Sequence, residues 1–393
     1  MQWKIVSLGD IADITSSKRI YVSDYTDSGI PFYRSKEIIE LHNNKEISVE
    51  LYISSKKYQE IKNKYGMPTK GDILLTSVGT LGVPYLIEDD TPFYFKDGNL
   101  TWFKNFHGIK AEFLYYSLMS PWTKRQFEEI TIGSTQKALT IVNLKNIKLK
   151  IPNITVQNKI VNKLKCLDDK IKNNVKQITI LFQIANTIFC DYFLDKIKNY
   201  EWTQSNVAAN ISEIREKNKQ GDDLPVLSVV KEGKFKASKD VFTKQVYSKN
   251  TEKYKIVRRN QIAYNPARAN IGSIAMLKDY DIGLVSPIYT VFKVKNTITP
   301  TFFYYYMKQP IFHERIKHHS IGTTRQNFPF EAFKMFPMIV PPMNLQLSFE
   351  KIIKPIEEKI TKLEEENEIL AKIRDTLIPK LMNGELPVEV GEN

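Results

Sequence analysis

The chain has few of the residues that define disulfide-rich, metal-binding or membrane proteins. Its 393 residues include only two cysteines, Cys166 and Cys190, and these do not form a Cys-x-x-Cys pair. A disulfide scaffold and a zinc ribbon are therefore excluded, and a reducing compartment is indicated. We find no apolar run that approaches the ~18 residues of a membrane span. The first residues, MQWKIVSLGDIADI, also lack the apolar segment of an export signal. We therefore expect a soluble protein of the cytoplasm.

Motifs for catalysis and metal binding are also missing. There is no GxxxxGK[ST] phosphate loop, no GxGxxG and no HExxH. The bare pair His318-His319 and the adjacent pairs Asp89-Asp90 and Asp168-Asp169 are poor candidates, because neighbouring side chains point in different directions. Tyr264–Arg268 (YNPAR) begins like the Asn-Pro-Pro-aromatic loop of adenine-N6 methyltransferases, but Ala and Arg replace the proline and aromatic residue that hold a flipped base. We expect no catalytic residues, no metal site and no bound cofactor in this chain.

Positive charge is what the chain has in excess. Lys and Arg number 57 against 44 Asp and Glu, which gives a net charge of +13. Residues 1–152 carry 20 basic and 17 acidic residues, and residues 200–340 carry 22 and 12. A polyanionic partner explains this excess better than a small metabolite does, with nucleic acid as the first candidate and an anionic membrane as the second. The 42% of hydrophobic residues is typical of a folded globular protein.

The sequence contains an internal repeat. When one half is laid on the other, Ala111–Pro121 (AEFLYYSLMSP) aligns with Pro300–Pro310 (PTFFYYYMKQP) without a gap. We call the shift that places Ala111 on Pro300 the repeat offset. At this same offset Ile132–Thr135 aligns with Ile321–Thr324, and the Pro-x4-Gln pattern at Pro152 recurs at Pro341. Several matches in order at one offset indicate a duplication.

Each half is expected to contain a mixed α+β domain followed by a long helix. Short runs rich in β-branched and aromatic residues, bounded by Gly, Pro and Asp, predict strands at Ile73–Thr76, Val83–Ile87, Phe93–Phe95 and Leu100–Phe103. Short helices are expected at Ala111–Ser120 and Thr301–Gln309. The fold class is α+β, with two repeated mixed domains separated by two long helices.

The two long helices show the 3-4 spacing of a coiled-coil seam. Asn174 interrupts the apolar seam of the first, and Asn367 and Arg374 interrupt that of the second. Pro355 is expected to kink the second helix or to mark its true start, and Pro379 to break it near its end. The apolar seam residues are Leu164, Leu167, Ile171, Ile178, Leu181, Ile356, Ile360, Leu363, Leu370 and Leu377.

Charge favours pairing of the two seams. Residues 153–199 carry 8 basic and 4 acidic residues, a net +4, whereas residues 341–393 carry 7 and 11, a net −4. We therefore expect an antiparallel coiled coil, in preference to two helices that only cap their own domains. The expected domains are residues 1–152, 153–199, 200–342 and 343–393.

Polar loops at the same place in both halves are candidate DNA contacts. Such loops combine backbone freedom with hydroxyl, amide and cationic groups, which can bind phosphates and read base edges. The loop candidates are Ser134, Thr135, Gln136 and Lys137 in the first half and Thr323, Thr324, Arg325 and Gln326 in the second. Further basic candidates are Lys18, Arg19, Arg34, Arg258, Arg259 and Arg268. For each, solvated surface charge or an ordinary glycine turn remains an alternative.

Six motifs along the chain point to one known family. They are Leu8–Ala12 (LGDIA), Gly71–Thr76 (GDILLT), Gly133–Lys137 (GSTQK), Thr187–Phe193 (TIFCDYF), Tyr264–Ser273 (YNPARANIGS) and Leu377–Leu386 (LIPKLMNGEL). With these motifs and the duplicated organisation, the chain resembles the specificity subunit of type I restriction–modification enzymes. Recognition domains and long helices alternate in that family as they do here, and the resemblance covers nearly the whole chain. The opening motif is only weakly echoed in the second half at Val207–Ala209.

The resemblance implies a prokaryotic, cytoplasmic, non-catalytic subunit. Each recognition domain would read one half of a bipartite, asymmetric target in double-stranded DNA, and the paired helices would set the gap between the half-sites. They would also dock two modification subunits, which bind S-adenosylmethionine and methylate adenine at N6. Two restriction subunits, which use ATP and Mg²⁺, can join this complex. No membrane partner is implied.

Two other readings remain open from the residues alone. The chain could be an enzyme with a degenerate motif, which predicts activity of the isolated chain. It could also be a basic scaffold that binds nucleic acid without sequence preference. The helix 157–195 spans ~58 Å at 1.5 Å per residue, longer than one ~34–36 Å turn of DNA, and this length favours the recognition reading.

Overall fold

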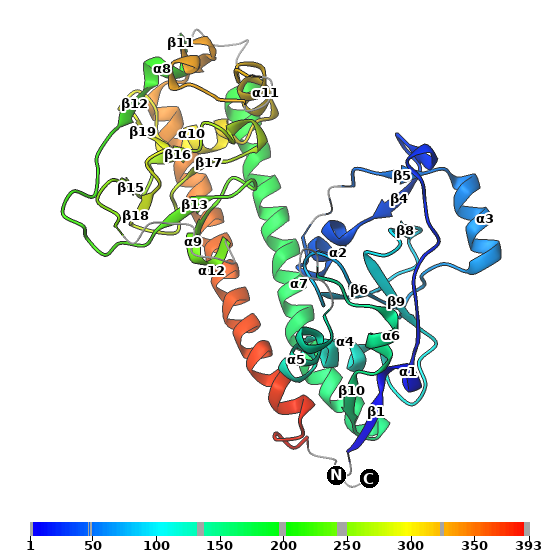
Figure 1. The fold of residues 1–393 in the computed structure, drawn as a ribbon. Coiled ribbons are helices and arrows are strands. Elements are labelled where there is room, and N and C mark those ends of the chain that lie inside the picture. Colours follow the sequence, from blue (N-terminus) through cyan, green and yellow to red (C-terminus); the bar gives the residue numbers. More distant parts are fainter. Residues whose placement is uncertain are drawn as a thin grey trace. The chain divides into compact units, whose positions relative to one another are not determined.

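The chain forms two compact units, and the first of them combines two segments that are distant in sequence. The first consists of Met1–Ile178 with Lys362–Asn393, and the second of Thr179–Thr361. In the computed structural model the described residues are 3–45, 47, 49–131, 137–195, 202–241, 250–322 and 326–388. Figure 1 shows the helices and strands of both units.

The first unit is an α+β domain with parts of both long helices. A four-stranded sheet in the order β2-β9-β6-β7 is joined by a second one in the order β3-β5-β4-β8, in which only β4 and β8 are parallel. The strands are β1 (Lys4–Ser7), β2 (Asp13–Thr15), β3 (Tyr25–Thr26), β4 (Ile30–Tyr33), β5 (Tyr52–Ile53), β6 (Ile73–Thr76), β7 (Pro84–Leu86), β8 (Tyr94–Phe95), β9 (Leu100–Lys104) and β10 (Lys148–Ile151). The helices are α1 (Leu8–Ile11), α2 (Ser35–His42), α3 (Ser55–Tyr65), α4 (Ala111–Met119), α5 (Pro121–Ile130), α6 (Ile141–Lys145) and the start of α7 (Ile154–Cys190).

The second unit repeats this plan. Its four-stranded sheet has the order β12-β19-β16-β17, and the pairs β11-β20, β13-β14 and β15-β18 lie outside that sheet. The strands are β11 (Thr203–Asn206), β12 (Ile211–Ile214), β13 (Leu227–Val229), β14 (Phe235–Ala237), β15 (Lys255–Arg258), β16 (Ile262–Tyr264), β17 (Ile274–Met276), β18 (Ile282–Val285), β19 (Thr290–Val294) and β20 (Pro337–Val340). The helices are α8 (Val207–Asn210), α9 (Ser238–Val241), α10 (Pro300–Met307), α11 (Pro310–His318) and α12 (Met343–Met382).

The sheets confirm the duplication that the sequence predicts. β6 begins at Ile73 and β16 at Ile262, two residues that the repeat offset places on each other. The weakly echoed opening motif also has a structural counterpart. The amide of Leu8 donates to the Ile147 carbonyl at 2.8 Å, and that of Val207 donates to the Phe336 carbonyl at 2.9 Å. The predicted strands and short helices of the first half are all present, within a few residues of their expected bounds.

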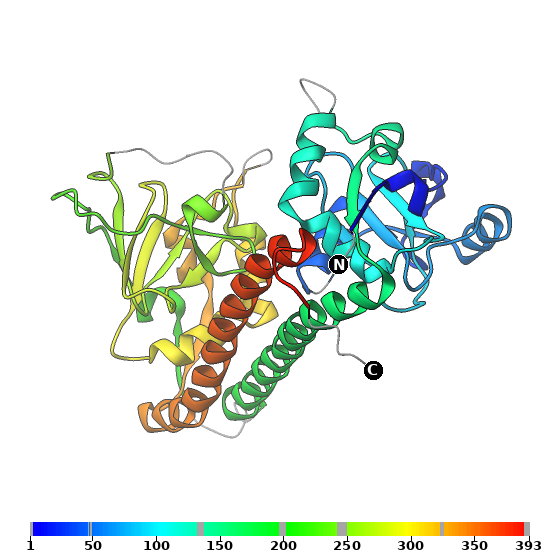
Figure 2. The same ribbon diagram turned by 90° about the horizontal axis from the view of Figure 1, so that it is seen from below.

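The core of each unit includes the end of one long helix and the beginning of the other. In the first unit Ile160 and Leu164 of α7 belong to the same apolar cluster as Leu381 of α12. In the second, Phe189 of α7 lies against Phe349 of α12, with ring centroids 5.7 Å apart. Figures 1 and 2 show a segment of α7 beside a segment of α12 in each unit. The long helices are therefore structural parts of both cores.

Polar seam residues of the two helices meet in the first unit. Asn174, which interrupts the first seam, is fully buried and donates from Nδ2 to Asn367 Oδ1 at 3.0 Å. Arg374, the other interruption, donates to Asp168 Oδ1 at 2.8 Å. Residue numbers rise along α7 as they fall along α12, so the packing is antiparallel. The opposite net charges of the two helices are expressed in another contact, in which Lys170 of α7 pairs with Glu366 of α12 at 3.3 Å.

The two prolines do not bound the second helix as expected. α12 is a single element from Met343 to Met382, so Pro355 does not start it and Pro379 does not end it. A proline inside a helix removes one hydrogen bond to the carbonyl four residues earlier. Pro355 is exposed, so water can bind the carbonyl that the proline leaves free. Packing of the apolar seam outweighs the local cost at both positions.

One long helical stretch has the length and mean hydropathy of a membrane span. Among the described residues, the stretch Ile154–Asp195 is long and apolar enough to cross a membrane by length and composition, with a mean hydropathy of 1.2 over 18 residues. In the second unit its aromatic residues serve packing, since Phe189 and Phe193 are at most 2% exposed in the core.

Candidate nucleic-acid interface

In the first unit, loops lie together at one end of the sheet β2-β9-β6-β7. After β6 the chain passes through the exposed residues Gly79 and Thr80 before β7. The Ser77 amide donates to the Asn99 carbonyl at 2.8 Å, which brings the segment before β9 to this end. The segment after β2 joins it, since the Gly98 amide donates to Ser16 Oγ at 3.4 Å. We call the exposed residues Lys18, Arg19, Thr80 and Lys137 the first loop face.

The second unit builds the same end of its sheet with different residues. The loop from Asn265 to Ser273 connects β16 to β17, and Gly272 closes it at φ +97°, where a Cβ would lie 2.3 Å from the Lys231 carbonyl oxygen. Asn270 Nδ2 donates to Gln326 Oε1 at 2.7 Å, which fixes both amides. We call Arg215, Lys217, Arg268, Asn270 and Gln326 the second loop face.

A pair of equivalent hydrogen bonds shows that the two faces correspond. The Leu139 amide donates to the Ser77 carbonyl, and the Phe328 amide donates to the Pro266 carbonyl, both at 2.9 Å. The repeat offset places one donor on the other and one acceptor on the other. In each unit the segment after the predicted polar loop is thus hydrogen-bonded to another loop of the sheet. That loop connects β6 to β7 in the first unit and β16 to β17 in the second.

Six of the predicted DNA contacts lie outside the described residues. They are Ser134, Thr135, Gln136, Thr323, Thr324 and Arg325. The residues that directly follow them, Lys137 and Gln326, are described, and both are exposed.

Most of the predicted arginines have acidic partners. Arg19 pairs with Asp97 at 3.0 Å, Arg258 hydrogen-bonds Glu216 at 2.8 Å and Arg259 pairs with Asp281 at 2.8 Å. Arg268, by contrast, is exposed and has no carboxylate partner among the described residues. Its charge is therefore the one least neutralised by the protein among the predicted arginines that are described.

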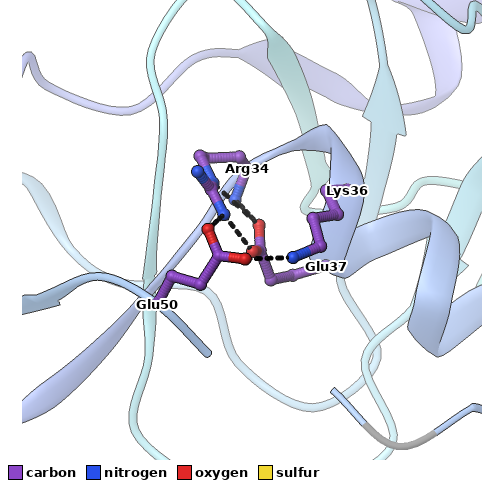
Figure 3. A network of polar contacts seen from close by, with 4 residues as sticks. All are labelled: Arg34, Lys36, Glu37 and Glu50. Carbon is purple, nitrogen blue, oxygen red and sulfur yellow. Dashed lines mark hydrogen bonds and ion pairs between the residues drawn. The ribbon is translucent and has the colours of Figure 1, made fainter. Parts of the chain in front are cut away.

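Arg34 is part of a compact ionic network (Figure 3). Its guanidinium donates to Glu37 Oε1 at 2.7 Å and to Glu50 Oε2 at 2.8 Å. Glu37 is 1% exposed, and Lys36 also bonds Glu50. The two cations lower the pKa of Glu50 to about 2, and the carboxylates raise the pKa of Arg34. A phosphate at this position would have to compete with two carboxylates.

Arg258 and Arg259 lie at the other end of β16 from Arg268. They precede β16, whereas the loop that contains Arg268 follows it. β16 has three residues, which at ~3.3 Å per residue separates its two ends by roughly 10 Å. The structure therefore brings Arg268 and Gln326 together and leaves Arg258 and Arg259 apart from them.

Sequence reasoning did not single out four residues of the two faces. Arg215 and Lys217 follow β12 as Ser16 and Lys18 follow β2, and both are exposed. Thr80 and Asn270 complete the faces from the loops after β6 and β16. The openings of the two halves align at a slightly larger offset than the rest of the repeat, the one that places Trp3 on Trp202. That second offset could have revealed Arg215 and Lys217.

The methyltransferase-like segment is used structurally. Asn265 is 8% exposed, and its Oδ1 accepts a hydrogen bond from the Ala267 amide at 3.0 Å. Its side chain holds the turn of the loop, so it is not directed at a substrate.

The sequence matches the profile of the Type I restriction modification DNA specificity domain over residues 1–180 and 201–372. The chain belongs to this family. It is thus a DNA specificity subunit of a type I restriction–modification system, and subunits of this family are non-catalytic. The two matched segments correspond to the two halves of the repeat.

Relatives and a solved structure extend over nearly the full chain. The type I restriction enzyme MjaIX specificity subunit of Methanocaldococcus jannaschii is 25% identical, with 98% of this chain and 94% of the relative covered. The HindI specificity subunit of Haemophilus influenzae is also 25% identical, with 98% and 99% covered. The crystal structure of the type I S subunit from M. genitalium shares the fold, with a TM-score of 0.54, 17% identity and 99% and 97% coverage.

In this specificity subunit, all ten predicted seam residues are buried or half-buried. In the first unit Leu164 is fully buried and Leu363 is 2% exposed. Each long helix is also held by a tyrosine of its own half. Tyr116 donates to Asp168 Oδ2 at 2.6 Å, and Tyr305 bonds Glu357. The repeat offset relates the two tyrosines and also the two carboxylates.

Proposed function

We propose that each unit reads one half of a bipartite, asymmetric DNA target through its loop face. The proposal is supported by one observation above all: two equivalent sheet ends carry different polar residues. The first face offers Thr80 and Lys137, and the second offers Arg268, Asn270 and Gln326. Arginine, glutamine and asparagine can make paired hydrogen bonds to guanine or adenine edges. Different side chains on a common frame are expected to read different sequences.

The residues 134–136 and 323–325 remain part of this proposal. They directly precede Lys137 and Gln326 in the chain, and their hydroxyl, amide and guanidinium groups suit base and phosphate contacts. Lys18, Arg19, Arg215 and Lys217 are proposed phosphate contacts beside them. Arg34 is a weaker candidate because two carboxylates hold it, and Arg258 and Arg259 are weaker because they lie at the opposite end of β16 from the second loop face.

The paired helices are proposed to set the gap between the half-sites. α7 has 37 residues, which at 1.5 Å per residue corresponds to about 56 Å. The buried contact between Asn174 and Asn367 supports one register of the two helices, because a slip would leave both amides without partners.

The helices are also proposed to dock two modification subunits. Ile180 and Ile184 on α7 are 54% and 44% exposed, and Ile369 and Ile373 on α12 are 58% and 43% exposed. The repeat offset relates the two pairs, and within each pair the residues lie one helical turn apart on the same face. Contiguous exposed apolar patches mark interaction sites, and these two equivalent pairs would be the centres of two such sites, one for each copy of the same partner. The modification subunits would bind S-adenosylmethionine, and restriction subunits would bring ATP and Mg²⁺, in the prokaryotic cytoplasm.

A methylation map tests the recognition role. The chain is expressed with its modification subunits in cells that lack both, and N6-methyladenine is mapped across the genome. We expect methylation at one motif made of two fixed half-sites and a constant gap. Methylation without a bipartite motif would contradict the proposal. A scaffold that binds nucleic acid without sequence preference would give binding in vitro and no motif.

A further inference from the structure

A pocket of about 150 Å³ opens on the second unit between a turn, a strand and two helices. The turn at Lys231–Gly233 forms one wall, β17 forms another, and α10 and α11 supply the rest. This volume is close to that of a cavity known to hold a benzene ring. The lining combines cationic and apolar side chains, chiefly Lys231, Lys308, His313, Tyr304, Met276 and Met307.

Lys308 is a cation without a counter-ion in this pocket. It has no carboxylate partner among the described residues, and its Nζ lies 5.3 Å from the centre of the Tyr304 ring. Burial, together with repulsion from Lys234 and Lys278, lowers the pKa of Lys308 to about 8. Lys278 differs because it pairs with Glu357 at 2.5 Å. A mostly buried ammonium group without a partner is unfavourable, and an anion would relieve this cost.

The first half of the repeat shows that the fold does not need this lysine. Met119 stands at the position equivalent to Lys308, and Tyr115 at that of Tyr304. There His42 of α2 fills the corresponding place, with Nδ1 2.8 Å from the Pro84 carbonyl oxygen and 3.4 Å from Tyr115 Oη. The open pocket and its lysine are therefore particular to the second unit.

We propose that this pocket binds a small organic carboxylate, with Lys308 as its counter-ion. The carboxylate would bond the Lys308 ammonium group, and Lys231 and His313 would add positive or hydrogen-bonding groups. The apolar part of the ligand would lie against Tyr304, Met276 and Met307. Glu232, the one carboxylate among the described lining residues, favours a ligand of single charge over a polyanion.

The occupied pocket would also support the second loop face. Gly272 lines the pocket and closes the loop that carries Arg268 and Asn270. A ligand there would restrict the turn that positions those side chains. This site is distinct from the DNA contacts proposed above, so either proposal can fail without the other.

Benzoate is a suitable probe, measured by isothermal titration calorimetry on the full chain purified with its modification subunits. We expect a Kd of roughly 1 mM or lower. Lys308→Met should weaken binding at least tenfold, because a charge-assisted hydrogen bond is lost. The variant should fold, since methionine is the residue of the first half. The matched control, Lys351→Met, removes an exposed lysine of α12 that does not line the pocket, and it should bind benzoate as the natural chain does.

Three results would overturn the proposal. One is the absence of benzoate binding, and another is equal affinity for the Lys308→Met variant. The third is preference for inorganic sulfate over benzoate, which would indicate an oxyanion site without an apolar subsite. Benzyl alcohol, the uncharged analogue, should bind at least tenfold more weakly than benzoate if the charge of Lys308 matters.

Discussion

Gln157 and Gln346, which the repeat offset places on each other, make the same three hydrogen bonds, each in its own unit. Gln157 Oε1 accepts from the Lys110 amide at 2.9 Å, and its Nε2 donates to the Gly108 and Pro152 carbonyls. Gln346 Oε1 accepts from the Thr299 amide at 2.8 Å, and its Nε2 donates to the Thr297 and Pro341 carbonyls. Both side chains are fully buried. Each glutamine fixes the first turn of a long helix to the loop before a short one.

The glutamine contacts are expected to be important for stability. Gln157→Leu or Gln346→Leu would leave one amide and two carbonyls without the partner that the side chain supplies. At ~1–3 kcal/mol for a buried group left unsatisfied, each variant should lose about 2–4 kcal/mol of unfolding free energy. Urea denaturation followed by tryptophan fluorescence measures this. Glutamate at the same position keeps the acceptor but puts a buried carboxylate against two carbonyl oxygens, so it should be at least as destabilising as leucine. An unchanged midpoint for either leucine variant would show that its contacts are dispensable.

Arg268 is expected to determine one half-site only. Arg268→Ala should relax the preference at one base pair of that half-site, at a cost of about 1–3 kcal/mol, and leave the other half-site unchanged. Binding to a library of DNA duplexes with randomised half-sites measures the effect. Arg259→Ala is the matched control, because Arg259 lies at the opposite end of β16 and pairs with Asp281. Equal weakening for all sequences would make Arg268 a phosphate contact instead.

Substitutions in the seam are expected to alter the gap between half-sites. Ile171 is 8% exposed and Leu167 is half-buried, so replacing both with glutamine puts polar groups into the helix pair without changing either sheet. We expect a loss of about 2–4 kcal/mol in helix-pair stability, with weakened assembly and a variable gap in the methylation map. Cys166→Ser, an exposed change on the same turn, should leave the gap constant. A constant gap in the seam variant would contradict the spacer role.

The isoleucine pairs are expected to set the number of modification subunits. Replacing Ile369 and Ile373 with arginine should remove one bound copy, and the same change at Ile180 and Ile184 should remove the other. Native mass spectrometry of the complex gives the stoichiometry, two copies for the natural chain and one for each double variant. Thr376→Arg changes another exposed residue of α12 and should keep both copies. Retention of two copies in both double variants would exclude these pairs as docking sites.

Much of this architecture could be predicted from the spacing of residues along the sequence. The repeat offset predicts two equivalent sheets, and the structure confirms them in β2-β9-β6-β7 and β12-β19-β16-β17. The seam pattern predicts two long helices because apolar residues every three or four positions can be buried only along one face. Pro355 and Pro379 led to the wrong expected boundaries for α12. The helix continues through both prolines because packing of the flanking turns outweighs the local cost of a proline.

The candidate site was harder to predict from the sequence. Sequence could name Arg34 and Arg268 as basic loop residues, but it could not tell that Arg34 faces Glu37 and Glu50 while Arg268 has no carboxylate partner among the described residues. Glu37 belongs to a helix turn whose direction depends on the fold, and Glu50 belongs to the segment before β5. The sequence also could not show that Lys308 belongs to a binding site, because the pocket is formed by segments far apart in the chain, from Lys231 to His313.

The sequence by itself determined the family, the repeat, the α+β class and the helical seams, because each depends on local composition or on regular spacing along the chain. Only the tertiary structure decided which charges are neutralised, which loops share a sheet end and which long-helix segments complete each core. Those outcomes depend on contacts between residues far apart in sequence, and the geometry of such contacts is fixed only when the whole unit packs.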